Sequence, residues 1–311
     1  MILAPPPQPG VVRFATVQDG YAGGAHGLLA THDGGRTWRT TPVAGPVRAL
    51  AVVGGARAWA ASGSAVWRTT NGGKTWSSTK TVGVRQLDFV DGRTGFAVGN
   101  RGGVLRTGDG GRSWRRVALG PLDSVCFTTR TSGWAARRGL VLRTSDGGRT
   151  WHRVYAAPFG PWSVGDVRCS GSSVWVLARD GVAAGSEGYL VYRTIDGERW
   201  FPALAQAMLG LPLPPIDAYS GPFDVVDPQT AVFVGSCSPC GHWTESLIRT
   251  SNAGQGWRRF PRILDGYPPL AVSFPTARRG YLLTARGLLW RTDDGGRRWR
   301  RVLRSHALLS S

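Results

Sequence analysis

One short signature, Thr-x-Asp-x-Gly-x-Thr-Trp, recurs seven times in this 311-residue chain and constrains its fold more than any other feature. Three close copies span 31–38, 107–114 and 144–151, and variants span 69–76, 250–257 and 292–299. A copy that is one residue shorter spans 194–200. A repeat with a period of a few tens of residues is typical of repeat architectures. We therefore expect one closed array, and we call each copy a box.

Each box has the composition of a turn that caps itself. Asp and Asn side chains accept hydrogen bonds from nearby backbone N–H groups, glycine permits a positive φ, and tryptophan anchors the returning strand. The acid or amide positions are Asp33, Asn71, Asp109, Asp146, Asp196, Asn252 and Asp294, and the tryptophans are Trp38, Trp76, Trp114, Trp151, Trp200, Trp257 and Trp299. Because a neutral amide serves in two boxes, we interpret these acids as structural and not as catalytic groups or metal ligands.

Three short apolar runs precede each box, and a fourth begins at its tryptophan. In the third unit they lie at 84–90, 96–99 and 104–107, and an aromatic residue stands near the start of nearly every second run. Such β-branched and aromatic runs between Gly, Asp and Asn predict strands joined by turns. The sequence thus predicts an all-β, seven-bladed β-propeller of four antiparallel strands per blade, with the box between the third and fourth strands. The expected blades are 11–42, 43–80, 81–118, 119–156, 157–203, 204–261 and 262–303, between a Pro-rich tail at 1–10 and a C-terminal tail at 304–311.

The boxes resemble those of the Asp-box (BNR, sialidase-type repeat) propellers. Within that class the Arg-Thr-x-Asp-Gly-Gly-x-Thr-Trp phrase is most similar to the photosystem II assembly and stability factor group and its bacterial relatives. The likeness covers about residues 11–303. It implies a fold shared with WD40-like propellers, but it specifies function poorly, because sialidases, xyloglucanases and sorting receptors carry the same box.

The chain is strongly basic, with a formal net charge of +19 and a pI of about 11.3. A polyanionic partner would explain this charge. About half of the basic residues, however, recur in and around the boxes, so we expect them to encircle one rim. No recognition-helix, RNA-binding or zinc-finger pattern is present, and we expect no specific nucleic acid partner.

Compartment and cysteine chemistry stay open. No run is long enough for a transmembrane segment, and no signal peptide is visible. An extracytoplasmic location is nevertheless favoured, because the proteins that the chain resembles mostly work there. Cys126 and Cys169 fall on first strands of neighbouring blades and form a candidate disulfide, with buried free thiols as the alternative. Cys237 and Cys240 form a single CxxC, which predicts a loop-closing disulfide in an exported protein and not a metal site.

The repeat breaks in the fifth and sixth units. Successive box tryptophans are 38, 38, 37, 49, 57 and 42 residues apart, and the extra residues lie at 157–163, 179–188, 203–221 and 236–245. Alternation of loops places all four insertions on the face opposite the boxes, where binding residues are expected. The hypothetical binding residues are Trp162, Arg179, Asp217, Tyr219, His242, Trp243, Glu245 and Tyr267. Alternatively, Trp162 and Trp243 only form a small core for the loops.

Enzymatic signatures are weak. Glutamate occurs only at 187, 198 and 245, the Arg-Ile-Pro phrase of sialidases is missing, and xyloglucanases of this repeat type use acids from two facing propellers. Asp217 and Glu245 stay open as a glycosidase pair. We therefore expect no catalytic residue, no metal and no cofactor. The predicted function is that of a monomeric, non-enzymatic assembly-factor-like propeller holding a protein partner on the insertions of blades five and six. The alternative is a glycan-binding or glycoside-hydrolysing propeller.

Overall fold

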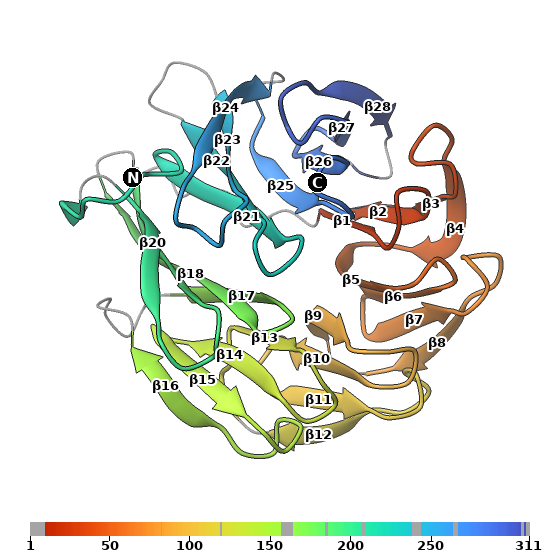
Figure 1. Cartoon of the computed structure of the whole chain (residues 1–311). Helices are drawn as coiled ribbons and strands as arrows, with labels where there is room; N and C mark the ends of the chain where they lie inside the picture. The colour runs from red at the N-terminus through yellow and green to blue at the C-terminus, as the bar shows by residue number, and fades with distance from the viewer. Residues whose placement is uncertain are drawn as a thin grey trace.

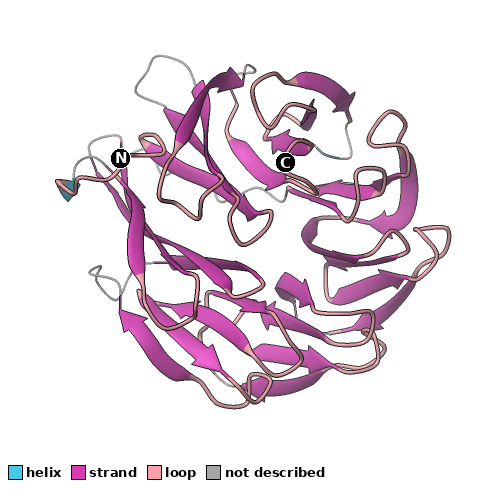
Figure 2. Ribbon diagram, in the orientation of Figure 1, coloured by secondary structure: helices cyan, strands magenta, loops and turns pink. Residues whose placement is uncertain are grey.

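The computed structural model describes residues 10–81, 83–118, 120–156, 164–183, 186–206, 209–237, 244–263, 267–305 and 308. These residues form strands and connecting loops almost exclusively (Figure 2). Each successive group of four strands forms one antiparallel sheet in chain order, and the seven sheets surround a common axis (Figure 1). The predicted all-β, seven-bladed propeller is therefore confirmed.

The strands of the first four blades are β1 (Val11–Phe14), β2 (Gly20–Gly24), β3 (Gly27–Thr31), β4 (Arg39–Ala44); β5 (Val47–Val53), β6 (Arg57–Ser62), β7 (Ala65–Thr69), β8 (Ser77–Lys80); β9 (Val84–Phe89), β10 (Gly95–Gly99), β11 (Val104–Thr107), β12 (Arg115–Ala118); β13 (Ser124–Phe127), β14 (Gly133–Arg137), β15 (Leu140–Thr144) and β16 (His152–Ala156). Those of the last three are β17 (Val164–Ser170), β18 (Ser173–Ala183), β19 (Ser186–Thr194), β20 (Phe201–Ala205); β21 (Tyr219–Val225), β22 (Ala231–Cys237), β23 (Thr244–Thr250), β24 (Arg258–Ile263); β25 (Pro269–Ser273), β26 (Gly280–Thr284), β27 (Leu288–Thr292) and β28 (Arg300–Arg304).

Each box lies between the third and fourth strands of its blade. In blade one, Thr31 ends β3 and Arg39 begins β4. The Asp33 carboxylate accepts hydrogen bonds from the backbone N–H groups of Arg36 (2.8 Å) and Thr37 (2.9 Å), and Trp38 Nε1 donates to the Gly35 carbonyl (3.2 Å). The box is thus a turn held together by its own side chains.

Strand alternation defines two faces of the ring. The turns between first and second strands and the boxes lie on one face, which we call the box face. The turns between second and third strands and the links between blades lie on the other, which we call the insertion face. We expected residues 179–188 to form a loop. Instead, they continue the β18–β19 hairpin as far as the Ala183↔Ser186 pair. The extra residues lengthen the hairpin because the ladder satisfies their backbone N–H and C=O groups.

The core lies between blades. Phe127 ends β13 and stacks on Phe96 of the preceding blade, with ring centroids 3.4 Å apart, and meets Trp151 of its own box edge to face at 5.9 Å. Phe14 makes the equivalent contacts with Tyr281 (3.4 Å) and Trp38 (6.1 Å). The aromatic residues that recur in the sequence therefore join neighbouring blades at these two interfaces.

Packing between β1 and the last blade closes the ring. The Phe14 backbone N–H donates to Ser273 Oγ (3.1 Å), and Tyr281 OH donates to the Gly34 carbonyl (3.0 Å). Leu308 lies beyond the last strand, yet it is fully buried in the cluster shared by blades seven and one. Part of the expected C-terminal tail thus packs into the closure.

A disulfide joins Cys126 of β13 to Cys169 of β17 and so links blades four and five. Cys237 ends β22, but its expected disulfide partner Cys240 lies outside the described residues. Within the described ranges, no helix has the length and apolar character needed to cross a membrane.

Candidate functional site

The hypothetical binding residues that the structure describes gather mainly at the junction of blades five and six. Arg179 reaches from β18 to the start of β21, where its Nε donates to Ser220 Oγ (2.9 Å) and its Nη2 to the Gly221 carbonyl (3.1 Å). Glu187 Oε2 accepts from the same Ser220, from N–H at 3.0 Å and Oγ at 2.5 Å. The lengthened hairpin of blade five is therefore bonded to blade six.

The Asp217 side chain is hydrogen-bonded within the protein, and Glu245 is buried. The Asp217 carboxylate accepts hydrogen bonds from the Ala218 backbone N–H (3.0 Å) and from Ser246 Oγ (2.9 Å). Tyr189 OH donates to the Asp217 carbonyl (2.8 Å), so the link between the blades is tied to both of them. Glu245 is 0% exposed on β23. These two acids do not form an open carboxylate pair of the kind that a glycosidase requires.

The other candidates are more dispersed. Tyr219 begins β21 and pairs with Ser236, which in turn pairs with Glu245, so these residues lie side by side across three strands. Tyr267 lies in blade seven, where the Arg286 guanidinium is 4.8 Å from its ring centroid. Trp162, His242 and Trp243 lie outside the described residues.

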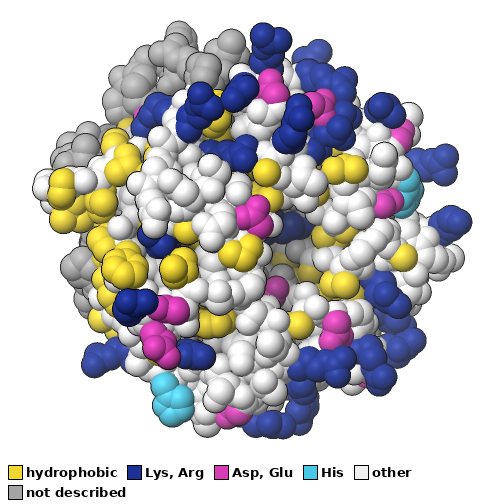
Figure 3. Space-filling model, viewed as in Figure 1, with side chains coloured by type: hydrophobic (Ala, Val, Ile, Leu, Met, Phe, Trp, Pro, Cys, Tyr) yellow, Lys and Arg dark blue, Asp and Glu magenta, His cyan; other side chains and the backbone are white. Residues whose placement is uncertain are grey.

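Apolar side chains exposed to solvent are concentrated on blade five. Among the described residues, the exposed large hydrophobic side chains are Val17 (36%), Ile195 (46%), Phe201 (45%), Leu209 (38%) and Leu211 (40%). Four of these five lie between 195 and 211. They follow the outer edge of blade five from its box to the link with blade six, and hydrophobic side chains gather over β20 in Figure 3.

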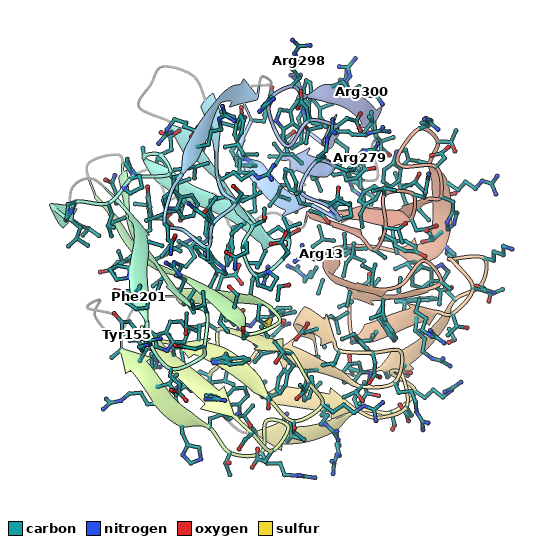
Figure 4. The ribbon with its side chains drawn as sticks, in the orientation of Figure 1. Arg13, Tyr155, Phe201, Arg279, Arg298 and Arg300 are labelled. Atoms are coloured by element: carbon teal, nitrogen blue, oxygen red, sulfur yellow. A yellow bond between two sulfur atoms is a disulfide. The ribbon has the colours of Figure 1, made fainter. Side chains whose placement is uncertain are left out.

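A cavity of about 430 Å³ lies at the axis of the ring. First strands of six blades line it, and its ionisable lining residues are Arg13, Arg48, Arg85, Asp166, Arg168 and Arg179. Arg13 stands near the centre of the ring in Figure 4. Arg48 and Arg85 are the second residues of β5 and β9, so the cavity opens toward the insertion face.

Sequence reasoning missed this cavity because it assigned the arginines to the box rim. The available signal was that Arg13, Arg48, Arg85 and Arg168 belong to first strands and not to the box phrase. A second cavity of about 140 Å³ shares Arg13 and Arg168 and is also lined by Asp88. Burial raises the pKa of Asp88 to about 6, although its carboxylate accepts a hydrogen bond from the Phe127 N–H.

No cluster of three or more potential metal ligands occurs among the described residues. The box carboxylates accept hydrogen bonds from the backbone of their own turns. Backbone and hydroxyl hydrogen bonds from Thr150 lower the pKa of Asp146 to about 2, and Asn71 accepts the equivalent bond from the Thr75 N–H (3.0 Å). The box acids are thus hydrogen-bond acceptors within turns.

Comparison with known proteins supports the resemblance seen in the boxes. A family model described as photosynthesis system II assembly factor YCF48 matches residues 78–210. The fold is similar to a solved structure of YCF48 bound to D1 peptide (TM-score 0.65, 17% identity, 94% of this chain and 95% of that one) and to YCF48 from Cyanidioschyzon merolae (TM-score 0.58, 18% identity, 82% and 84%). The expected resemblance to this group is confirmed. A search of curated proteins found no match.

Glycoside hydrolases share the fold as well. The GH74 xyloglucanase from Xanthomonas campestris has a TM-score of 0.72 at 15% identity, and the GH74 enzyme from Niastella koreensis has 0.70 at 14%. This chain is covered to 96% and 92%, but it spans only about half of each enzyme (54% and 52%). At these identities the likeness concerns the fold alone.

Proposed function

We propose that this propeller, which resembles the photosystem II assembly factor group, is a non-enzymatic binding protein that holds a polypeptide partner on the insertion face of blades five and six. The observation that carries the proposal is the exposure of Leu209 (38%) and Leu211 (40%) on the link between blades five and six, at the insertion-face end of the apolar strip. Contiguous exposed apolar surface marks interaction sites more often than scattered residues do. The similar YCF48 structure contains a bound D1 peptide, which supports a polypeptide as the class of ligand.

The rigidity of the junction supports the same assignment. Arg179, Glu187 and Ser220 join the lengthened hairpin of blade five to blade six. Arg259 Nη2 donates to the Pro215 carbonyl (2.6 Å), and the Ile216 backbone N–H donates to Tyr189 OH (2.7 Å). The link that carries Leu209 and Leu211 is thus attached to both blades, and a preorganised surface loses less entropy on binding.

The glycoside hydrolase alternative has no comparable support. It requires two open carboxylates about 5–9.5 Å apart. Glu245 is fully buried, and both Asp217 carboxylate oxygens accept hydrogen bonds from the protein itself.

The test compares how much of the partner is captured from an extract of the native organism by the wild-type protein, a double variant and a control variant. Leu209→Ser combined with Leu211→Ser should reduce capture about tenfold or more, because truncated apolar anchors at the centre of an interface typically cost 2 kcal/mol or more. Val17→Ser is the matched control, since Val17 is similarly exposed but lies on blade one. Equal capture by the double variant and the control would refute the proposed surface.

A photo-crosslinker at position 211 should label the same partner, whereas one at position 17 should not. A crosslinker at position 195 distinguishes the two ends of the apolar strip, because Ile195 belongs to the box of blade five. Labelling from 195 alone would place the partner on the box face and contradict the proposal.

A further inference from the structure

We propose that the axial cavity is a binding site for a small anion bearing a phosphate or carboxylate group. The first observation is its charge. Five arginines and one aspartate are the ionisable residues that line its 430 Å³, a size within the usual range for small-molecule sites. Clefts lined by charge of one sign concentrate ions of the opposite sign.

Neighbouring acids leave part of this positive charge without an ion pair. Arg168 Nη1 is 2.8 Å from Asp166 Oδ1, Arg13 Nη1 is 3.5 Å from Asp224 Oδ1, and Arg179 Nε is 3.8 Å from Glu187 Oε1. Arg48 and Arg85, which are exposed at the mouth, form no ion pair within the described ranges. Arg85 donates hydrogen bonds to the Gly99 and Leu122 carbonyls, so Arg48 is the guanidinium at the mouth that the described residues leave unengaged.

The inner part of the cavity supplies hydrogen-bond donors. Arg168 Nε is buried and has no hydrogen-bond partner among the residues that the structure describes. About a quarter of the Arg168 side chain is exposed, and this residue lines the cavity, so its remaining N–H groups face the space where an anion would bind. The guanidinium also lies over the Phe223 ring, 5.6 Å from its centroid, which holds it in place.

Arg13 and Arg168 line the same cavity from opposite sides of the ring. They belong to blades one and five, and both line the two adjoining cavities. Burial lowers the pKa of Arg13, Asp224 opposes this shift, Arg168 adds to it, and Asp166 and Asp88 oppose it. Guanidinium groups match the geometry of phosphate and carboxylate oxygens, so an anion between Arg13 and Arg168 could accept hydrogen bonds from both sides.

The anion has two sources with the same chemistry: a free metabolite, or an acidic side chain or terminal carboxylate of a polypeptide. The site does not rest on the apolar surface of blade five, because none of its lining residues belongs to 195–211.

Titration calorimetry at low ionic strength tests the site with two probes, inorganic phosphate and a tetraglutamate peptide. The expected result is saturable binding of at least one probe with a stoichiometry of one. If both bind, they should compete. Phosphate binding alone identifies a free anion as the ligand, and peptide binding alone identifies a polypeptide carboxylate.

Variants separate the cavity from the general basicity of the chain. Arg168→Gln should weaken binding about tenfold or more, since a hydrogen bond to a charged group contributes about 1.5–3 kcal/mol. Arg48→Gln should weaken it about threefold, and because Arg48 is exposed and forms no ion pair with a described residue, this variant stays informative if Arg168→Gln does not fold. Arg36→Gln removes the same charge from an exposed box turn and should have less than about a twofold effect.

Three results would overturn the proposal. They are the absence of saturable binding by either probe, a stoichiometry of several anions per chain, and equal affinities in the Arg48→Gln and Arg36→Gln proteins.

Discussion

At the scale of single residues, the box shows how one side chain can organise a turn. The Asp109 carboxylate accepts from the backbone N–H groups of Arg112 (2.9 Å) and Ser113 (3.0 Å) and from the hydroxyls of Thr107 and Ser113 (both 2.7 Å). In the sixth box, Asn252 Oδ1 accepts from the Gly256 N–H at 2.9 Å. An amide oxygen can therefore occupy the acceptor position, but its NH₂ group has to find an acceptor of its own.

Asp109→Asn should therefore lower the free energy of unfolding by no more than about 0.5 kcal/mol. Asp109→Ala should lower it by about 1–2 kcal/mol, because both backbone donors lose their acceptor. Urea denaturation of the two variants measures the difference. Equal and large losses would contradict the interpretation of the box acid as a hydrogen-bond acceptor.

The box acids also predict a dependence of stability on acidity. Hydrogen bonds from Thr150 lower the pKa of Asp146 to about 2, and the backbone N–H groups of Glu198 and Arg199 lower that of Asp196. Both pKa values lie below the unfolded value of about 3.9, so the stabilisation is complete above that pH and is lost as the pH falls toward 2. The free energy of unfolding should decrease over this interval, and Asp146→Asn should make the decrease smaller.

The pKa of Asp88 is shifted in the opposite direction, so its effect on stability has the opposite dependence on pH. Its folded pKa, about 6, lies above the unfolded value, so its contribution is present below about pH 4 and is lost as the pH rises toward 6. Asp88→Asn should remove this component while leaving the acidic decrease unchanged. Denaturation curves at pH 2.5, 4, 5 and 6.5 separate the two effects.

Ala253 has a strained backbone. Its φ is +53°, in the left-handed region, at the place where the first box has Gly34 with a φ of +71°. A side chain with a Cβ costs about 1 kcal/mol or more in this region. Ala253→Gly should raise the free energy of unfolding by about 0.5–1 kcal/mol, and a lower melting temperature would show that the Ala253 methyl group, which is buried, contributes more than the strain costs.

At the scale of elements, a glycine facing a phenylalanine sets the contact between first and second strands. Phe127 pairs with Gly133, and a Cβ at Gly133 would lie 2.5 Å from the Phe127 ring. Phe14 with Gly20 and Phe89 with Gly95 repeat this arrangement at 2.4 and 2.5 Å. Because the glycine has no side chain, the phenylalanine ring can lie against it and contact the aromatic residue of the preceding blade.

Gly133→Ala should therefore destabilise the protein by about 1–3 kcal/mol, as overpacking of a core does. Gly108→Ala is the matched control, because a Cβ at Gly108 would meet no atom within 4 Å and its φ is not positive. Thermal unfolding of the two variants measures the contrast. Similar melting temperatures would show that the ring of Phe127 can move aside at no cost.

At the scale of the whole molecule, the described residues show no strand exchanged between the two ends of the ring. Every sheet consists of four consecutive strands, so closure depends on side-chain contacts such as Phe14 with Tyr281 and on the burial of Leu308. The Cys126–Cys169 disulfide adds one covalent link between neighbouring blades.

Reduction of this disulfide should lower the free energy of unfolding by about 3–4 kcal/mol, the value expected for a loop of 43 residues if unfolded-chain entropy dominates. Cys126→Ala combined with Cys169→Ala should have about the stability of the reduced protein, and reductant should lower its melting temperature by less than it lowers that of the wild type. Melting curves with and without dithiothreitol test this. A wild-type protein that is equally stable under both conditions would contradict a structural role for the bond.

The sequence by itself determined the features that repeat. Box turns, strand order and blade number follow from local hydrogen bonding and from short apolar runs at a regular spacing, and both are readable from neighbouring residues. Asn71 and Asn252 revealed the role of the box acid because they are exceptions within a repeat.

Only the tertiary structure decided what happens where blades meet and where the repeat breaks. Arg13 and Arg168 are 155 positions apart, yet they line one cavity because ring closure brings first strands together at the axis. The insertion at 179–188 became a hairpin, and Glu245 became buried, because ladder pairing and cross-strand neighbours set exposure. Such properties depend on contacts distant in sequence, which no local pattern encodes.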